Sequence, residues 1–97
     1  MSVRNLVIET IKRNMPELAA KYHVSSIGLF GSIVRDDFST ADSDIDILVD
    51  FSKPIGIEFI DLADYLENLF KRKVDLVSKS GIKASYFKEI EREIIYV

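Results

Sequence analysis

IGLFGSIVRDDFSTADSDIDILVDF, residues 27–51, contains two apolar segments joined by a polar loop. The first segment breaks at Gly31-Ser32, and the second opens with Asp44-Ile45-Asp46. Short segments rich in β-branched residues and bounded by turn residues are typical of strands. Because side chains alternate along a strand, Asp44 and Asp46 are expected on the same face. Two like charges at the mouth of an apolar strand need a physical reason.

The composition is that of an ordinary globular protein. The 97 residues predict one domain, 1–97, with one small site. A net charge of −3 and a pI near 5.1 argue against a stand-alone nucleic-acid binder, so no stable nucleic-acid binding is expected. The absence of cysteine excludes disulfides, thiolate metal sites and cysteine nucleophiles. Without a signal-peptide core or an apolar run of about 18 residues, we expect no membrane partner and a cytoplasmic location.

The segment before residue 27 is predicted to be helical. Apolar residues recur at helical spacing behind Ser2, a good N-cap. Pro16 is expected to interrupt this helix, because proline donates no intrahelical hydrogen bond, and residues 17–22 form a second helical piece. His23 has no second histidine or cysteine with which to share a metal, so it is interpreted as a loop residue without chemistry.

The segment after residue 51 alternates between helix and strand. The clearest helix spans residues 57–71, where one apolar stripe indicates core packing. Residues 74–77 form a third strand, a last helix follows, and the tail 94–97 is compatible with an edge strand. The predicted fold is α/β or α+β: a mixed sheet of three to four strands, with helices packed against one face.

The carboxylates carry the chemistry. Six lie between residues 36 and 50, and most such clusters are simply solvated. Asp44 and Asp46 differ because a rigid strand holds them roughly 6.6 Å apart on one face, where both can lean onto one cation or bracket two. Only oxygen donors are available, which favours Mg²⁺ or Mn²⁺ over zinc.

A cation held by few carboxylates keeps open positions that phosphate oxygens usually fill. Gly31-Ser32 is suited to binding those phosphates, since a glycine at a strand end exposes backbone N–H groups beside a hydroxyl. A lone Gly-Ser pair would mean little, but followed by Asp-x-Asp it predicts a phosphate cradle that faces a metal site.

The sequence resembles the minimal nucleotidyltransferases of the DNA polymerase β superfamily. The family pattern of strand, Gly-Ser, early arginine, Ser-Asp-x-Asp and a later Val-Asp-Leu strand is matched by Leu29-Phe30-Gly31-Ser32, Arg35, Ser43-Asp44-Ile45-Asp46-Ile47-Leu48-Val49 and Lys73-Val74-Asp75-Leu76-Val77. The resemblance covers nearly the whole chain, and three motifs in order are far more specific than any one.

The resemblance implies a nucleotidyltransferase fold and specific roles for these residues. Asp44 and Asp46 would each ligate two Mg²⁺ ions that orient a nucleoside triphosphate. Asp75 would hold the metal nearest the nucleophile and could accept its proton. Nucleotide binding would fall to Gly31, Ser32, Arg35 and Ser43. All three carboxylates must be ionised, which their mutual repulsion opposes until cations arrive.

The chain departs from the family pattern in its central loop. Eleven residues separate Ser32 from Asp44, one more than the usual ten, and Asp36 stands where a glycine commonly follows the arginine. The extra residue is expected at the loop tip, near residues 39–41. A residue with a Cβ at position 36 is expected to reshape the turn at Arg35 more than the carboxylate positions.

The resemblance also suggests a partner. Minimal members of the family often act as antitoxins beside an all-helical HEPN toxin, and some transfer AMP from ATP to a toxin tyrosine. We therefore expect a Mg²⁺-dependent protein adenylyltransferase and antitoxin. Two alternatives stay open: a nucleotide-binding antitoxin that inhibits its partner by occlusion alone, and a small-molecule nucleotidyltransferase. The sequence leaves the nucleobase and the choice between homo- and hetero-oligomer open.

Overall fold

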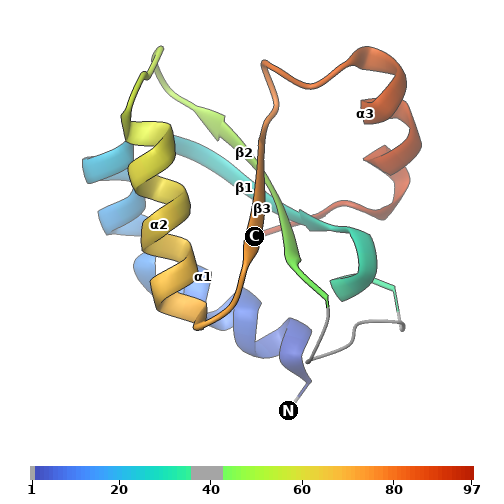
Figure 1. The fold of residues 1–97 in the computed structure, drawn as a ribbon. Coiled ribbons are helices and arrows are strands. Elements are labelled where there is room, and N and C mark those ends of the chain that lie inside the picture. Colours follow the sequence, from blue (N-terminus) through green and yellow to red (C-terminus); the bar gives the residue numbers. More distant parts are fainter. Residues whose placement is uncertain (1, 36–42) are drawn as a thin grey trace.

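A computed structural model describes residues 2–35 and 43–97, whose strands form a mixed four-stranded sheet of order β3-β2-β1-β4 (Figure 1). The elements in chain order are α1 (Val3–Tyr22), β1 (Val24–Phe30), the 3-10 turn η1 (Gly31–Ile33), β2 (Ile45–Phe51), α2 (Glu58–Phe70), β3 (Val74–Ser78), α3 (Ala84–Ile90), the 3-10 turn η2 (Glu91–Glu93) and β4 (Ile95–Tyr96). The predicted mixed sheet with helices packed on it is confirmed. The expectations for Asp36 and for residues 39–41 lie outside the described residues.

The strand pairing follows from the connections between strands. β1 and β2 pair antiparallel, with Phe30 opposite Asp46, and the loop that joins them is long enough for this return. β2 and β3 pair parallel, because α2 carries the chain back across the sheet. The tail forms the predicted edge strand, in which Ile95 pairs antiparallel with Leu29 of β1.

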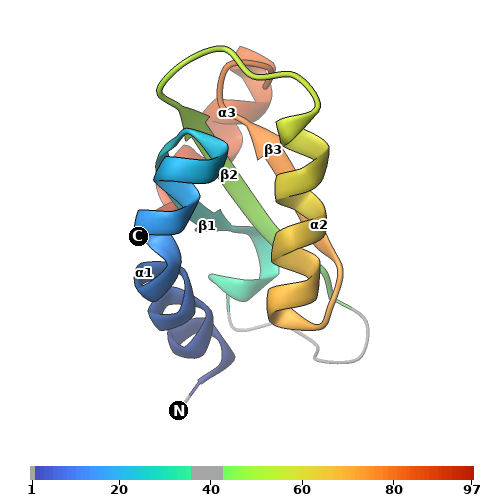
Figure 2. The same ribbon diagram turned by 90° about the vertical axis from the view of Figure 1, so that its left-hand side faces the viewer.

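Alternate strand residues point to opposite faces of the sheet. One face packs under α1 and α2, where the buried cluster includes Ile27, Leu29, Ile45, Ile47, Val49, Leu62 and Leu66. The opposite face carries a smaller cluster of Phe30, Leu48 and Ile90, the last from α3. The expectation that all helices pack against one face is therefore wrong. α3 covers part of the second face (Figures 1 and 2), because Phe30 and Leu48 would otherwise expose apolar surface to water.

α1 is one continuous helix. Ser2 caps it as predicted, its Oγ accepting a hydrogen bond from the Asn5 N–H at 3.1 Å. The interruption predicted at Pro16 is wrong, since the helix runs through that residue to Tyr22. Proline inside a helix costs about 3 kcal/mol, but Val7, Ile11, Leu18 and Tyr22 are buried on both sides of it. Burying each of such side chains contributes about 1.5–3 kcal/mol, which outweighs the local cost.

α2 is close to its predicted range and is held against α1. It ends where Lys71 adopts a left-handed conformation with φ 57°. The Tyr65 hydroxyl of α2 donates to Asn14 Oδ1 at 3.1 Å and to Glu17 Oε2 at 3.2 Å, both on α1. Among the described helices, none is both long enough and apolar enough to span a membrane.

Candidate active site

Two carboxylates meet where β2 and β3 run side by side. Asp46 and Asp75 are register partners in this parallel pair, and adjacent strands lie about 4.8 Å apart. After burial, the negative charge of Asp75 is the largest cause that raises the pKa of Asp46. Asp46 is half-buried and Asp75 is exposed. Alternation places Asp46 on the same face as Leu48, which is the face that α3 covers.

Asp44 does not lie within the strand. The sequence predicts Asp44 and Asp46 on one strand face, but β2 begins at Ile45, so Asp44 stands just before it and is exposed. Its negative charge nevertheless acts on Asp46. The three predicted carboxylates therefore share one electrostatic environment, with Asp46 at its centre.

The pKa of Asp46 reports this environment. Burial is the largest cause that raises the pKa of Asp46, to about 6 from an ordinary value of 3.8, and the charges of Asp75 and Asp44 follow. Arg35 acts in the opposite direction. A carboxyl group whose ionisation is opposed by burial and by neighbouring carboxylates is one that a cation would stabilise. This fits the repulsion expected from the sequence.

Gly31 brings the chain backbone against Asp46. It adopts φ 76°, a region that disfavours residues with a side chain. A Cβ at this position would overlap the Asp46 carboxylate, with the Asp46 Cγ only 2.9 Å away. Glycine is therefore required both by its conformation and by this close approach. The Gly31 carbonyl then accepts from the N–H groups of Val34 at 3.0 Å and Arg35 at 3.2 Å, which closes the turn at η1.

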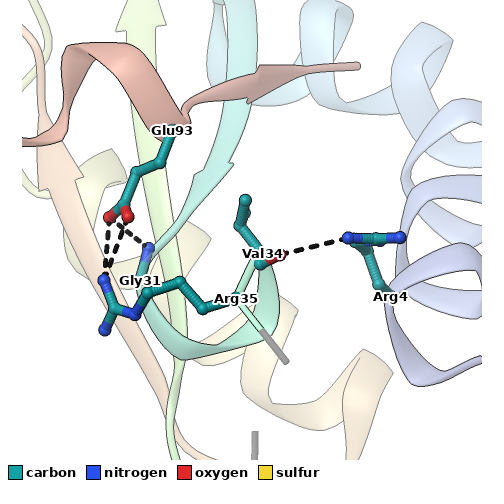
Figure 3. A network of polar contacts seen from close by, with 5 residues as sticks. All are labelled: Arg4, Gly31, Val34, Arg35 and Glu93. Atoms are coloured by element: carbon teal, nitrogen blue, oxygen red, sulfur yellow. Dashed lines mark hydrogen bonds and ion pairs between the residues drawn. The ribbon is translucent and has the colours of Figure 1, made fainter. Parts of the chain in front are cut away.

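A glutamate from the C-terminal part of the chain also contacts this turn. The Gly31 N–H donates to Glu93 Oε1 at 2.9 Å, and Arg35 Nη1 lies 3.0 Å from Glu93 Oε2 and 3.3 Å from Oε1 (Figure 3). Arg4 of α1 fixes the same turn from the opposite side, donating from Nη1 to the Val34 carbonyl at 3.1 Å (Figure 3). The turn is therefore held between α1 and η2.

No pattern in the sequence pointed to Glu93. It lies 62 residues from Gly31, and it is one of three acidic residues, with Glu89 and Glu91, in a short C-terminal segment that shows no motif. Tyr86 was also missed, because its spacing identifies it only as part of a helix face. It is 42% exposed, and burial followed by the charges of Asp46 and Asp75 raises the pKa of its hydroxyl.

A cavity of about 320 Å³ links these groups. Its lining comprises Phe30, Gly31, Arg35, Asp46, Tyr86, Glu89, Ile90 and Glu93. Pockets of about 300–1,000 Å³ are the usual size for small-molecule ligands. A larger pocket of about 700 Å³ lies near the far end of β2, beside Phe51 and Phe59, but contains none of the predicted site residues. The smaller cavity is therefore the candidate nucleotide site.

Only some of the predicted site residues lie at the cavity. Gly31, Arg35 and Asp46 line the cavity, and Asp75 is paired with Asp46. Ser32 and Ser43 are half-buried neighbours of Gly31 and Asp44, and neither belongs to the cavity lining. Their assignment to nucleotide binding stays a prediction.

The donor set suits a hard divalent cation. Asp44, Asp46 and Asp75 offer carboxylate oxygens, the ligands that Mg²⁺ prefers, and burial together with the charges of Asp75 and Asp44 raises the pKa of Asp46. Within residues 2–35 and 43–97, no three acidic or histidine side chains form a ready-made metal site. The carboxylates would therefore have to adjust around an incoming ion.

Comparison with known proteins identifies the family. The model of the nucleotidyltransferase domain matches residues 8–97. This chain belongs to the nucleotidyltransferase family. The protein adenylyltransferase MntA of Thermococcus cleftensis is 48% identical to this nucleotidyltransferase over 82 residues, which cover 84% of this chain and 82% of the relative.

Solved structures agree with this assignment. The structure of a putative minimal nucleotidyltransferase is 28% identical, with a TM-score of 0.77, and the match covers 98% of this chain and 95% of that one. A chain from a complex of tri-AMPylated Shewanella oneidensis HEPN toxin with MNT antitoxin is 23% identical, with a TM-score of 0.61 over 96% of this chain and 66% of that one. The second likeness shows the shared fold alone. The predicted nucleotidyltransferase fold is confirmed.

Proposed function

We propose that this nucleotidyltransferase, acting as a single unit over residues 1–97, transfers AMP from ATP to a tyrosine of a HEPN-domain toxin and serves as its antitoxin. The observation that carries the proposal is the pairing of Asp46 with Asp75 directly beside the Gly31 turn. This arrangement places groups that suit a cation next to groups that suit phosphate, which phosphoryl transfer requires.

The chemistry divides between the two sets of residues. The tyrosine oxygen attacks the α-phosphorus of ATP, the bond from that phosphorus to the bridging oxygen of the β-phosphate breaks, and pyrophosphate leaves. Asp75 is exposed on β3 and takes the tyrosine proton. The Gly31 N–H and the Arg35 guanidinium bind phosphate oxygens.

Asp44, Asp46 and Asp75 would hold Mg²⁺, with Mn²⁺ as an alternative. The bound ions would neutralise charge on the triphosphate and orient it. Because the carboxyl group of Asp46 resists ionisation in the protein alone, we expect cation binding and ionisation of Asp46 to be coupled.

Relatives support the acceptor and the donor. The Thermococcus cleftensis relative is named a protein adenylyltransferase, and the Shewanella oneidensis complex contains an AMPylated HEPN toxin with its MNT antitoxin. The described site is open on the side of Asp75, since that residue is exposed. A tyrosine from another molecule can therefore approach the carboxylate pair.

The test is a transfer assay read by intact mass. The protein is incubated with ATP, Mg²⁺ and a HEPN-domain protein, the product of the adjacent gene where that gene encodes one, and we expect an AMP-sized mass gain on the partner that EDTA abolishes. Asp46→Asn and Asp75→Asn should each slow transfer by about 10²-fold or more. Asp64→Asn removes the same charge from an exposed position on α2 and should transfer normally.

Two results would contradict the proposal. One is a partner that gains no mass with the wild-type protein. The other is a mass gain that persists at the wild-type rate in Asp46→Asn. If the Asp46→Asn protein also inhibits the toxin fully without ATP, inhibition by occlusion replaces transfer as the antitoxin activity.

A further inference from the structure

The Glu93 carboxylate binds the two groups to which the proposed function assigns the phosphates. It accepts from the Gly31 N–H at 2.9 Å and pairs with Arg35 at 3.0 Å (Figure 3). A carboxylate resembles one edge of a phosphate group, with two anionic oxygens that accept from an N–H and a guanidinium. Glu93 therefore has the chemistry of a phosphate group and occupies a phosphate-binding position.

We propose that Glu93 is a further determinant of nucleotide binding: its carboxylate fills the Gly31–Arg35 anion site of the nucleotide-free protein, and ATP must displace it. This inference rests on the proposed function for the identity of the competing anion. It makes Glu93 a competitor of the nucleotide and gives it no part in the transfer step.

Glu93 and a phosphate group must compete because they use the same hydrogen-bond donors. A backbone amide has one hydrogen, and that of Gly31 is directed at Glu93 Oε1. A phosphate oxygen can take this hydrogen only after the carboxylate has moved. Glu93 also lines the same cavity as Asp46, so a triphosphate that entered beside it would bring several negative charges against the carboxylate. Its side chain is 23% exposed, and water screens that repulsion only in part.

Displacement is feasible because the ion pair of Glu93 with Arg35 lies near the surface. The Arg35 side chain is 55% exposed, and ion pairs in such positions contribute little to stability. Glu93 ends η2, immediately before the short edge strand β4, whose register with β1 is Gly28↔Tyr96 and Leu29↔Ile95. A rotation of the Glu93 side chain frees both donors and leaves this pairing intact.

The opposite role would be that of a positioning residue, in which Glu93 holds Arg35 ready for the nucleotide. The two roles predict opposite changes in nucleotide affinity when Glu93 is replaced. Removing a competitor tightens nucleotide binding, whereas removing a positioning residue weakens it. Glu93→Gln is the sharpest variant, because its amide oxygen can still accept from Gly31 while the negative charge is gone. Glu93→Ala removes the acceptor as well.

The experiment measures binding without catalysis. Isothermal titration gives the Kd of a non-hydrolysable ATP analogue with Mg²⁺, and of pyrophosphate without metal, for wild type, Glu93→Gln and Glu93→Ala. If Glu93 fills the site about nine-tenths of the time, Glu93→Ala should bind about tenfold more tightly, because the competent fraction rises to one. Glu93→Gln should also bind more tightly than wild type but by a smaller factor, because its amide oxygen can still accept from the Gly31 N–H. Glu91→Gln, exposed on the same short turn, is the control and should match wild type.

An amide chemical-shift titration locates the effect. The Gly31 N–H signal should move in Glu93→Gln relative to wild type, and pyrophosphate should shift it further at lower concentration in the variant. Equal or weaker binding by both Glu93 variants, with wild-type binding intact, would overturn the inference.

The outcomes separate this inference from the proposed function. If wild type AMPylates its partner but the variants bind no more tightly, the competition by Glu93 is wrong and the transfer function stands. If wild type transfers nothing while Glu93→Gln binds pyrophosphate more tightly through Gly31, the transfer function is wrong and the anion competition stands. Absence of binding by every variant would overturn both.

Discussion

Asp46 on β2 and Asp75 on β3 are register partners across a parallel strand pair, and after burial the charge of Asp75 is the largest cause that raises the pKa of Asp46. Two carboxyl groups this close favour a state in which one of them is neutral, because their negative charges repel each other. At neutral pH the protein instead carries charges that repel one another and that burial disfavours. The Asp46–Asp75 pair therefore lowers the stability of the cation-free protein and favours the binding of a cation.

Asp46→Asn should therefore stabilise the metal-free protein at neutral pH. The pKa of Asp46 is about 6 in the folded protein and 3.8 ordinarily, so the folded state binds more protons than the unfolded state between about pH 4 and 6. Stability falls as the pH rises through that window, and the penalty is complete above pH 6. We expect the advantage of Asp46→Asn, measured by urea unfolding in EDTA, to be greatest at pH 7–8 and to vanish near pH 4.

Added Mg²⁺ should make wild type more stable than Asp46→Asn at neutral pH. It should stabilise wild type more than Asp46→Asn, because a ligand that binds only the folded state stabilises it in proportion to its affinity. Asp64→Asn, exposed on α2, should change the unfolding free energy by less than about 0.5 kcal/mol at neutral pH. A destabilised Asp46→Asn protein at pH 7.5 in EDTA would show that the repulsion is unimportant.

Gly31→Ala should disable the site and weaken the fold. The new Cβ would adopt φ 76° and overlap the Asp46 carboxylate. A left-handed conformation alone costs about 1–2 kcal/mol for such a residue, and the overlap should add to this. We expect a loss of about 2–3 kcal/mol in urea unfolding and no measurable AMP transfer.

Two further variants isolate the cause. Gly81→Ala meets its nearest atom at 3.9 Å and should be tolerated. In the double variant Gly31→Ala/Asp46→Ala the overlap with the carboxylate is absent, and the backbone strain remains together with a 3.3 Å approach to the Cβ at position 46. Its stability loss, measured relative to Asp46→Ala, should therefore be smaller than that of Gly31→Ala relative to wild type. Equal losses would assign the whole effect to the backbone.

The sequence predicted the elements that local pattern controls. Spacing and alternation identify α2, β2 and β3 to within a residue or two, and the connection lengths predict which strands pair parallel. The motif residues Gly31, Asp46 and Asp75 meet because the strand register brings them to one end of the sheet. These are consequences of short-range order and of simple topology.

The contacts between segments far apart in the sequence could not be predicted. Pro16 follows the local rule for ending a helix, but burial of Leu18 and Tyr22 beyond it outweighs that rule. α3 covers the second sheet face because Ile90 finds Phe30 and Leu48 there, a pairing between distant segments. Glu93 carries no motif, and its place at Gly31 depends on where β4 joins the sheet.

Tyr65→Phe should destabilise the protein without affecting transfer. The hydroxyl links α2 to α1 through Asn14 and Glu17, and the loss of such a bond costs about 0.5–1.5 kcal/mol. The ring should remain beside Tyr22, whose centroid lies 5.5 Å away. The urea midpoint should fall with an unchanged m-value, whereas Tyr96→Phe, at an exposed ring, should have little effect.

The same hydroxyl predicts a dependence on alkaline pH. Burial first and Glu17 second raise the pKa of Tyr65 above its ordinary value of 10.0. The stabilisation is therefore complete below pH 10 and is lost as the pH rises through the folded pKa. The difference between wild type and Tyr65→Phe should shrink above pH 10, and a constant difference would contradict this assignment.

Arg4 should influence catalysis from outside the cavity. Its guanidinium donates a hydrogen bond to the Val34 carbonyl at 3.1 Å. Val34 directly precedes Arg35, whose side chain forms part of the anion site. Arg4→Gln should loosen the turn, raise the KM for ATP several-fold and change kcat less, because the carboxylate pair on β2 and β3 is untouched. The expected loss of stability is about 1 kcal/mol.

Arg13→Gln provides the control. Arg13 is an exposed arginine on the same helix whose hydrogen bond, to Thr10 Oγ1 at 3.4 Å, stays within α1, so KM should not change. Arg4→Lys retains a cationic donor and should recover part of the ATP affinity. If Arg4→Gln lowers stability but leaves KM unchanged, the contact with Val34 supports the fold alone and the turn at Arg35 is held by Gly31 and Glu93 without help from α1.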